Sequence, residues 1–243
     1  MTSIRPTGIE HAAAALRNIE RRQAVLANNL TNVNTTGFKG ERVFSRLLDA
    51  ESTAVADAST DFRPGTLSVT AQPFDLAIQR DGFLVVDTPN GERLTRGGSF
   101  SLDESGRLVD DTGNVVLGEQ DERGGTRGPV VIPATARDVR IDASGAVIAD
   151  GTQIARLRME RVPPGTRLTH EGANLFATPS ARESIAPGER TLKQGALEDS
   201  NVNSVESLVD LISVQRAYAS VQKALTTIDS ARGISAVELA KPV

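Results

Sequence analysis

The chain has 243 residues, enough to bury a sizeable core in one large domain or two modest ones. Seven Phe, one Tyr and no Trp leave few aromatic side chains for a large ligand pocket or a base-stacking surface. A net charge of −4 without a basic block disfavours a nucleic-acid partner, and the absence of Cys excludes disulfides and thiolate metal sites.

The N-terminal segment predicts an amphipathic helix over residues 9–33. Thr7 and Glu10 form a capping-box pattern at its start, and Gly37 can take the left-handed conformation of the chain reversal that ends it. Residues at alternating spacings of three and four, with one polar interruption, indicate a coiled-coil seam. They are Ile9, Ala12, Leu16, Ile19, Gln23, Leu26, Leu30 and Val33.

The stretch ANNLTNVNTTGFKG, residues 27–40, holds no His, Cys or acidic residue, so we expect neither a catalytic loop nor a metal site there. Asn is a poor residue for a helix interior, so the pair Asn28 and Asn29 indicates hydrogen bonds to adjacent subunits. The alternative for these residues and for Asn34 is helix capping and hydrogen bonding within the turn. Phe38 is interpreted as a hydrophobic plug at the reversal, with an intersubunit anchor as the alternative.

The middle of the chain, from about Gly65 to Gln194, shows short β-type runs separated by turn signals, which predicts an antiparallel β domain. Residues 49–62 are rich in Ala, Ser, Thr and Asp and indicate a linker of low order. Arg96 is predicted to donate hydrogen bonds to nearby carbonyls. The predicted runs include Leu67–Thr70, Phe74–Ile78, Phe83–Val86 and Val139–Ile141, and the turns include Asn90-Gly91, Asp103–Gly106, Asp142–Gly145 and Asp150-Gly151.

A second amphipathic helix is predicted near the C-terminus, capped by Asn203 with Glu206 at the third helical position and ending at Gly233. Its early residues, 205–212, form a wider apolar face than one neighbour can cover. A later stripe again steps by three and four, through Leu211, Val214, Tyr218, Val221, Leu225 and Ile228.

These elements predict an α+β fold with two regions. Residues 1–62 and 195–243 form a coiled-coil-like helical assembly domain plus a linker, around a central antiparallel β domain over residues 63–194. No run of about 18 apolar residues predicts a membrane span, and Met1–His11 lacks the apolar region of a cleavable signal peptide. Neither His11 nor His170 lies near a nucleophile motif, so we expect no enzymatic activity, cofactor, metal or small-molecule substrate.

Four stretches in this order resemble the bacterial flagellar rod and hook proteins. Residues 27–40 are similar to the family's N-terminal signature, and Leu76–Val86 is similar to its apolar run around Asp-Gly-Phe. Leu94–Leu102 resembles its Thr-Arg-x-Gly-x-Phe segment, and Gln194–Asn203, continuing to Tyr218, resembles its C-terminal signature. The chain is thereby identified as a member of this family.

The resemblance implies an axial subunit that the flagellar export apparatus secretes without cleavage into the periplasm-spanning rod. Its partners would be copies of itself and other rod and hook axial proteins. The short linker and total length favour a proximal-rod subunit; a distal-rod subunit and, from another class, a secreted β-domain binding module remain alternatives. The predicted assembly-interface residues are Leu16, Ile19, Leu26, Asn28, Asn29, Leu30, Asn32, Phe38, Asn201, Asn203, Leu211, Gln215, Tyr218 and Leu225.

Overall fold

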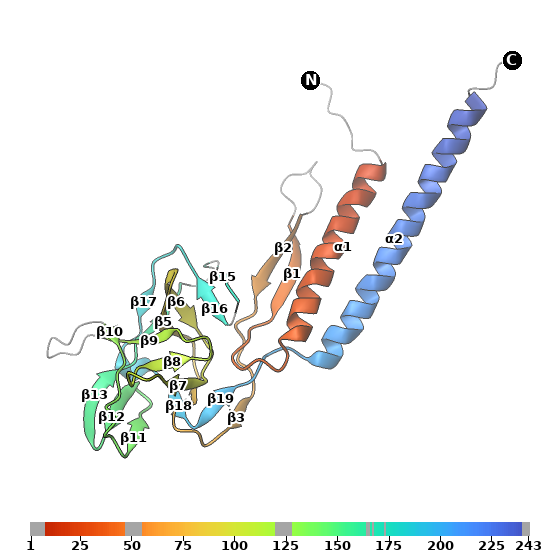
Figure 1. Cartoon of the computed structure of the whole chain (residues 1–243). Helices are drawn as coiled ribbons and strands as arrows, with labels where there is room; N and C mark the ends of the chain where they lie inside the picture. The colour runs from red at the N-terminus through yellow and green to blue at the C-terminus, as the bar shows by residue number, and fades with distance from the viewer. Residues whose placement is uncertain are drawn as a thin grey trace. The chain divides into compact units, whose positions relative to one another are not determined.

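A computed structural model of the chain describes residues 8–46, 55–119, 128–163, 166, 168–172 and 174–239. It has an α+β fold, with an N-terminal helix, a central antiparallel β region and a C-terminal helix (Figure 1). The chain divides into two compact units. Unit 1 comprises Met1–Thr31, Glu41–Asp61 and Val202–Val243, and unit 2 comprises Asn32–Gly40 and Phe62–Asn201.

Unit 1 is built from two helices and a hairpin. Helix α1 (Gly8–Thr31) contacts helix α2 (Ser204–Leu239) and both strands of the hairpin, β1 (Glu41–Arg46) and β2 (Val55–Thr60). In Figure 1 the hairpin and α2 lie on different sides of α1. The two sequence-distant ends of the chain therefore fall into one unit together with the hairpin. Neither described helix is long and apolar enough to cross a membrane.

The burial pattern of α1 differs from a simple two-helix seam. The most buried α1 residues are Ala14, Val25 and Asn29, whereas the predicted seam residues Leu16 and Leu26 are half-buried. Because the hairpin and α2 cover different parts of the helix, burial is spread over more than one stripe. The coiled-coil seam along α1 is therefore not confirmed. The start of the predicted helix, with Thr7, lies outside the described residues.

Two sequence predictions in unit 1 were wrong. Helix α2 continues through Gly233 to Leu239, because one Gly costs a helix only about 1 kcal/mol and the next Pro is Pro242. The stretch expected to be a linker of low order contains strand β2, which pairs with β1 from Glu41↔Thr60 to Arg46↔Val55. The remaining part of that predicted linker before β2 lies outside the described residues.

Unit 2 is a β structure centred on a ten-stranded antiparallel sheet. Its main order is β15-β16-β6-β5-β9-β8-β7, with β10, β14 and β17 joined at the side. The strands of this sheet are β5 (Phe83–Thr88), β6 (Gly91–Thr95), β7 (Phe100–Leu102), β8 (Leu108–Asp110), β9 (Val115–Gly118), β10 (Gly128–Pro129), β14 (Met159–Arg161), β15 (Thr169–His170), β16 (Leu175–Ala177) and β17 (Glu183–Ser184).

Three smaller sheets complete unit 2. One has the order β11-β12-β13, and the other two are the pairs β18-β4 and β19-β3. A short 3₁₀ helix, η1 (Pro187–Glu189), precedes β18. The strands are β3 (Leu67–Val69), β4 (Leu76–Ile78), β11 (Val139–Ile141), β12 (Ala146–Ala149), β13 (Thr152–Arg156), β18 (Leu192–Gln194) and β19 (Ala196–Glu198).

The core of unit 2 joins these sheets. Leu84, Val86, Leu108 and Val147 are fully buried in one apolar cluster, to which β4, β14 and β18 also contribute. Each predicted β run contains a strand, although the run Phe74–Ile78 is a strand only from Leu76, and the turn glycines Gly91, Gly106, Gly145 and Gly151 have positive φ. Aliphatic packing therefore supplies the core of a chain that has few aromatic residues.

Unit 2 extends beyond the predicted boundaries of 63–194. Residues 195–201 join it because β19 pairs with β3, in the register Ala196↔Val69 to Glu198↔Leu67. Asn32–Gly40, expected as part of the helical region, also belongs to unit 2. The two signature-like stretches at the ends of the chain therefore meet in the β unit.

Candidate functional site

The predicted interface residues on the two helices are only partly covered within unit 1. Leu16, Ile19, Leu26 and Leu30 on α1 are half-buried, and so are Leu211, Tyr218 and Leu225 on α2. Asn28 and Gln215 are exposed. The Tyr218 hydroxyl lies 3.5 Å from a carboxylate oxygen of Glu20, which places the single Tyr on the face of α2 that contacts α1.

The first turns of α2 carry an apolar surface that the described part of the chain leaves uncovered. We call it the outer α2 patch: Val205, Leu208, Val209 and Ile212, which are 70%, 48%, 60% and 43% exposed. On the same helix Ser207 and Val214 are buried, so the patch faces away from the buried stripe. The sequence prediction that residues 205–212 form a wider apolar face than one neighbour covers is confirmed.

Asn29 makes its hydrogen bonds inside unit 1. Its side-chain amide donates to the carbonyl of Glu41 at 2.8 Å, and its amide oxygen accepts from the backbone N–H of Glu41 at 2.9 Å. Asn29 is 7% exposed. The sequence suggested bonds to adjacent subunits for this residue, but here both bonds fix the start of β1 against α1.

Two other predicted polar residues make hydrogen bonds at the start of α2 and in the turn after α1. The side-chain oxygen of Asn203 accepts hydrogen bonds from Val205 at 3.0 Å and Glu206 at 3.2 Å, so the predicted N-cap of α2 is confirmed. In unit 2, Asn32 accepts from Thr35 at the reversal that follows α1.

Phe38 is 2% exposed in unit 2, and its ring centroid lies 5.6 Å from that of His170 in an edge-to-face arrangement. This burial agrees with its interpretation as a plug.

A buried cluster of charges lies where three of the signature-like stretches meet in unit 2. We call Lys39, Arg96 and Glu198 the junction cluster. The ammonium of Lys39 lies 2.7 Å from Oε1 of Glu198, and Nη1 of Arg96 lies 3.2 Å from its Oε2. Their side chains are 0%, 4% and 1% exposed. A buried charge destabilises a protein unless it is paired and hydrogen-bonded, so the native structure requires these three side chains to be together.

Backbone groups complete the junction cluster. Glu198 also accepts from the backbone N–H of Gly65 at 2.9 Å, and Lys39 donates to the carbonyl of Arg63 at 2.9 Å. Arg96 donates to the carbonyls of Gly82 and Arg80 at 3.0 and 2.7 Å, as predicted for it.

Asn201 makes further hydrogen bonds in the same region. Its side-chain oxygen accepts from the N–H of Gly40 at 2.8 Å, and its amide donates to the carbonyl of Arg63 at 3.0 Å. Its backbone N–H reaches the carbonyl of Phe38 at 3.4 Å. The stretches that enter unit 2 after α1 and leave it before α2 are therefore bound to one another.

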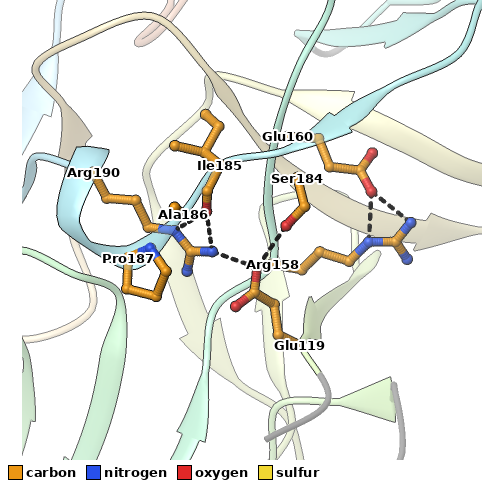
Figure 2. Close-up of a pocket in the computed structure, with 8 residues that line it drawn as sticks. All are labelled: Glu119, Arg158, Glu160, Ser184, Ile185, Ala186, Pro187 and Arg190. Carbon is orange, nitrogen blue, oxygen red and sulfur yellow. Dashed lines mark hydrogen bonds and ion pairs between the residues drawn. The ribbon is translucent and has the colours of Figure 1, made fainter. Parts of the chain in front are cut away.

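Unit 2 also has a polar cavity of about 310 Å³, shown in Figure 2. The charged side chains that line it are Glu119, Arg158, Glu160 and Arg190, and each has an ion-pair partner. Because these charged side chains already pair with one another or with neighbouring residues, the cavity is a weaker candidate for function than the outer α2 patch.

The cavity belongs to an ion network that also includes Glu92. The pKa of Glu92 lies below the ordinary value of 4.5, first because the Arg158 guanidinium donates a hydrogen bond to it at 2.8 Å, against the opposing effect of burial. Arg182 donates a second bond at 2.9 Å. These contacts stabilise the sheet surface.

Comparison with known families places the chain among flagellar proteins. The sequence model described as "Flagella basal body rod protein" matches residues 9–39. "Flagellar hook protein FlgE/F/G D1 domain" matches residues 77–149, and "Flagellar basal body rod FlgEFG protein C-terminal" matches residues 193–235. The three matches cover most of both helices and a large part of the β unit.

Individual relatives match over nearly their whole length. The chain is 31% identical to the "Flagellar basal-body rod protein FlgF" of Rhizobium meliloti, over 88% of this chain and 90% of the relative. It is 30% identical to the protein of the same name from Escherichia coli, over 91% and 94%. It is also 30% identical to the "Flagellar basal-body rod protein FlgG" of Bacillus subtilis, over 89% and 92%.

Proposed function

We propose a specific role for this chain within the family to which it belongs, the flagellar basal-body rod proteins: it is a structural subunit of the rod that polymerises through its terminal helices, in the proximal part of the rod. The single observation that carries the mode of assembly is the outer α2 patch.

The outer α2 patch favours a protein partner. A single exposed Leu needs no explanation, but four aliphatic side chains within two helical turns form a contiguous apolar surface. Complete burial of one such side chain stabilises by about 1.5–3 kcal/mol, so covering the patch would supply several kcal/mol to an interface. We assign this gain to association with neighbouring subunits.

A rod requires a contact that joins two different surfaces of successive subunits. A surface that binds a different surface on the next copy does not close on itself, and repetition then builds a helical tube. We propose that half-buried seam residues on both helices, including Leu16, Leu26 and Leu225, complete their burial against neighbours in a coiled-coil-like arrangement. The neighbours are copies of this chain and other rod and hook axial proteins.

We assign the position of this chain along the rod from the length of one segment. Relatives named FlgF and FlgG both match at about 30% identity, so the overall identity favours neither. The short segment before Arg63–Thr70 favours the proximal rod, because this chain resembles the proximal-rod proteins there, whereas distal-rod proteins of the family carry a longer segment at that place. Delivery by the flagellar export apparatus is part of the same proposal.

A deletion strain tests this function. Loss of the gene should remove the external hook and filament, seen by electron microscopy, as well as motility, because distal parts cannot assemble on an incomplete rod. A motile deletion strain with normal filaments would contradict the proposal and favour a secreted binding module. A subunit-resolved map of the basal body would test the proximal position directly.

A further inference from the structure

The last part of unit 2, residues 190–201, pairs with its first part. Strand β18 pairs with β4, in the register Leu192↔Ile78 to Gln194↔Leu76, and β19 pairs with β3. In the described residues each of these is a two-stranded sheet. The first two strands of the β unit therefore depend for pairing on its last two. We call residues 190–201 the closing segment.

Arg190 anchors the start of the closing segment inside unit 2. Its side chain is 0% exposed, and its guanidinium donates to the carbonyls of Leu157 at 3.0 Å and Ser144 at 3.2 Å. It also bonds the carbonyl of Ile185 and the carboxylate of Glu119, as Figure 2 shows. One side chain thus joins four separate parts of the β unit.

Gln194, four residues later, anchors the middle of the segment. Its amide oxygen accepts from the backbone N–H of Ile141 at 3.1 Å, and its amide donates to the carbonyl of Pro73 at 2.6 Å. The backbone N–H of Gly195 donates to the carbonyl of Asp75 at 2.8 Å. The segment therefore connects β11 to the loop before β4.

Glu198 anchors the end of the segment through charge. It lies 159 positions from Lys39 and 102 from Arg96 along the chain, and its carboxylate pairs with both buried cations. Without Glu198, Lys39 and Arg96 would be buried without the carboxylate that compensates their charge, which strongly disfavours their burial. The native burial of these cations thus requires residue 198 to be in place.

We propose that the closing segment controls the folding of unit 2. The β unit reaches its native packing only when residues 190–201 dock onto β3, β4 and the junction cluster. A chain that lacks this segment therefore stays unfolded across the β unit. Pairing between strands far apart in the sequence requires the chain to close a long loop, which costs entropy before the stabilising contacts form. The native β unit therefore forms in a late, cooperative step. This inference concerns one chain and stands whether or not the rod assembles as proposed.

A nicked form of the full-length protein tests the proposal. A protease recognition sequence is inserted between Gly188 and Glu189, which are exposed in η1, and the folded protein is cut there. The nicked protein should keep slow hydrogen exchange at Leu84–Val86 while both fragments are present. After separation in denaturant and dilution, fragment 1–188 alone should lose that protection, and addition of fragment 189–243 should restore it.

Two variants of fragment 189–243 show whether the junction cluster is needed to restore the protection of fragment 1–188. Glu198→Gln should require at least about a tenfold higher fragment concentration to restore protection, because a buried charged pair is lost. Asp210→Asn, an equivalent change at an exposed α2 position, should behave as the wild type. The proposal fails if fragment 1–188 is protected on its own, if fragment 189–243 does not restore protection, or if Glu198→Gln restores it as well as the wild type.

The uncut protein offers a second measurement that needs no variant. During refolding with pulsed hydrogen exchange, the amides of Leu84–Val86 and of Leu192–Gln194 should become protected at the same rate. Protection of β5 in an earlier, separate phase would show that the sheet forms without the closing segment, and would overturn the proposal.

Discussion

The Nζ atom of Lys39 lies 2.7 Å from Oε1 of Glu198, and neither side chain is more than 1% exposed. The contact joins the stretch that follows α1 to the stretch that precedes α2, and Arg96 shares the same carboxylate. Because Glu198 is the carboxylate that pairs with both buried cations, its removal leaves Lys39 and Arg96 without this compensating charge. The junction cluster should therefore contribute strongly to the stability of unit 2.

The first prediction concerns this carboxylate. Glu198→Gln should lower the free energy of unfolding of unit 2 by about 3–5 kcal/mol, as measured by urea denaturation. The control is Asp138→Asn, whose carboxylate is 59% exposed and pairs with the exposed Arg140 at 3.1 Å. An exposed pair of this kind contributes less than about 1 kcal/mol. Equal effects of the two changes would show that burial of the cluster contributes nothing.

The second prediction concerns Asn29. Asn29→Ala should destabilise unit 1 by about 1–3 kcal/mol, because the backbone N–H and carbonyl of Glu41 lose their partners. Hydrogen exchange at β1 should accelerate with it. Arg22→Ala, at an exposed position of the same helix, should change stability by less than about 0.5 kcal/mol. A neutral Asn29→Ala in the isolated chain would favour an intersubunit role for that amide instead.

The third prediction concerns close backbone approach in unit 2. A β-carbon on Gly98 would lie 1.9 Å from the carbonyl oxygen of Leu76, so Gly98→Ala requires the backbone to move. We expect a loss of more than about 2 kcal/mol in the free energy of unfolding. Gly188→Ala, with nothing within 4 Å, should stay within about 1 kcal/mol of the wild type. Thermal unfolding of the two variants compares them, and similar midpoints would contradict the packing described here.

The fourth prediction concerns pH and Glu92. Its pKa in the folded protein lies below 4.5, mainly through the hydrogen bond from Arg158. The folded state therefore binds fewer protons than the unfolded chain in the window just below pH 4.5, and this contribution to stability is lost as pH falls through it. Glu92→Gln should be less stable than the wild type at pH 7, and the difference should shrink below pH 4.5.

The matched control for this prediction is Glu104→Gln, at an exposed position. Its difference from the wild type should stay small across the same pH range. Denaturant titrations at several pH values measure both variants. A Glu92→Gln difference that did not depend on pH would exclude the ion network as its source.

Local patterns predicted much of the fold. The spacing of apolar residues predicted both helices, Asn203 was recognised as a cap, and turn signals such as Asn90-Gly91 predicted the hairpins. These features depend on residues a few positions apart, and local hydrogen bonds or glycine φ values decide them. The resemblance to a known family then supplied the function that composition alone does not indicate.

Long-range partners could not be predicted in the same way. Lys39 lies within the signature-like stretch, but nothing near it identifies Glu198, 159 positions away, as its partner. Strand β2 was missed because an Ala-, Ser- and Asp-rich stretch has low intrinsic strand propensity, and pairing with β1 supplies its order. The exposed apolar face at residues 205–212 was predicted more directly, because a face wider than one neighbour covers is visible from the spacing of apolar residues.

The central claim is that the outer α2 patch joins this chain to its neighbours in the rod. Leu208 is 48% exposed, so Leu208→Asp should leave the thermal transition of the isolated protein unchanged. In a deletion strain, the amount of this chain in purified basal bodies is the decisive measurement, with Glu104→Lys as a control at another exposed position. The account predicts that Leu208→Asp is absent from basal bodies while the control is incorporated normally. Incorporation of Leu208→Asp at the wild-type level would contradict it.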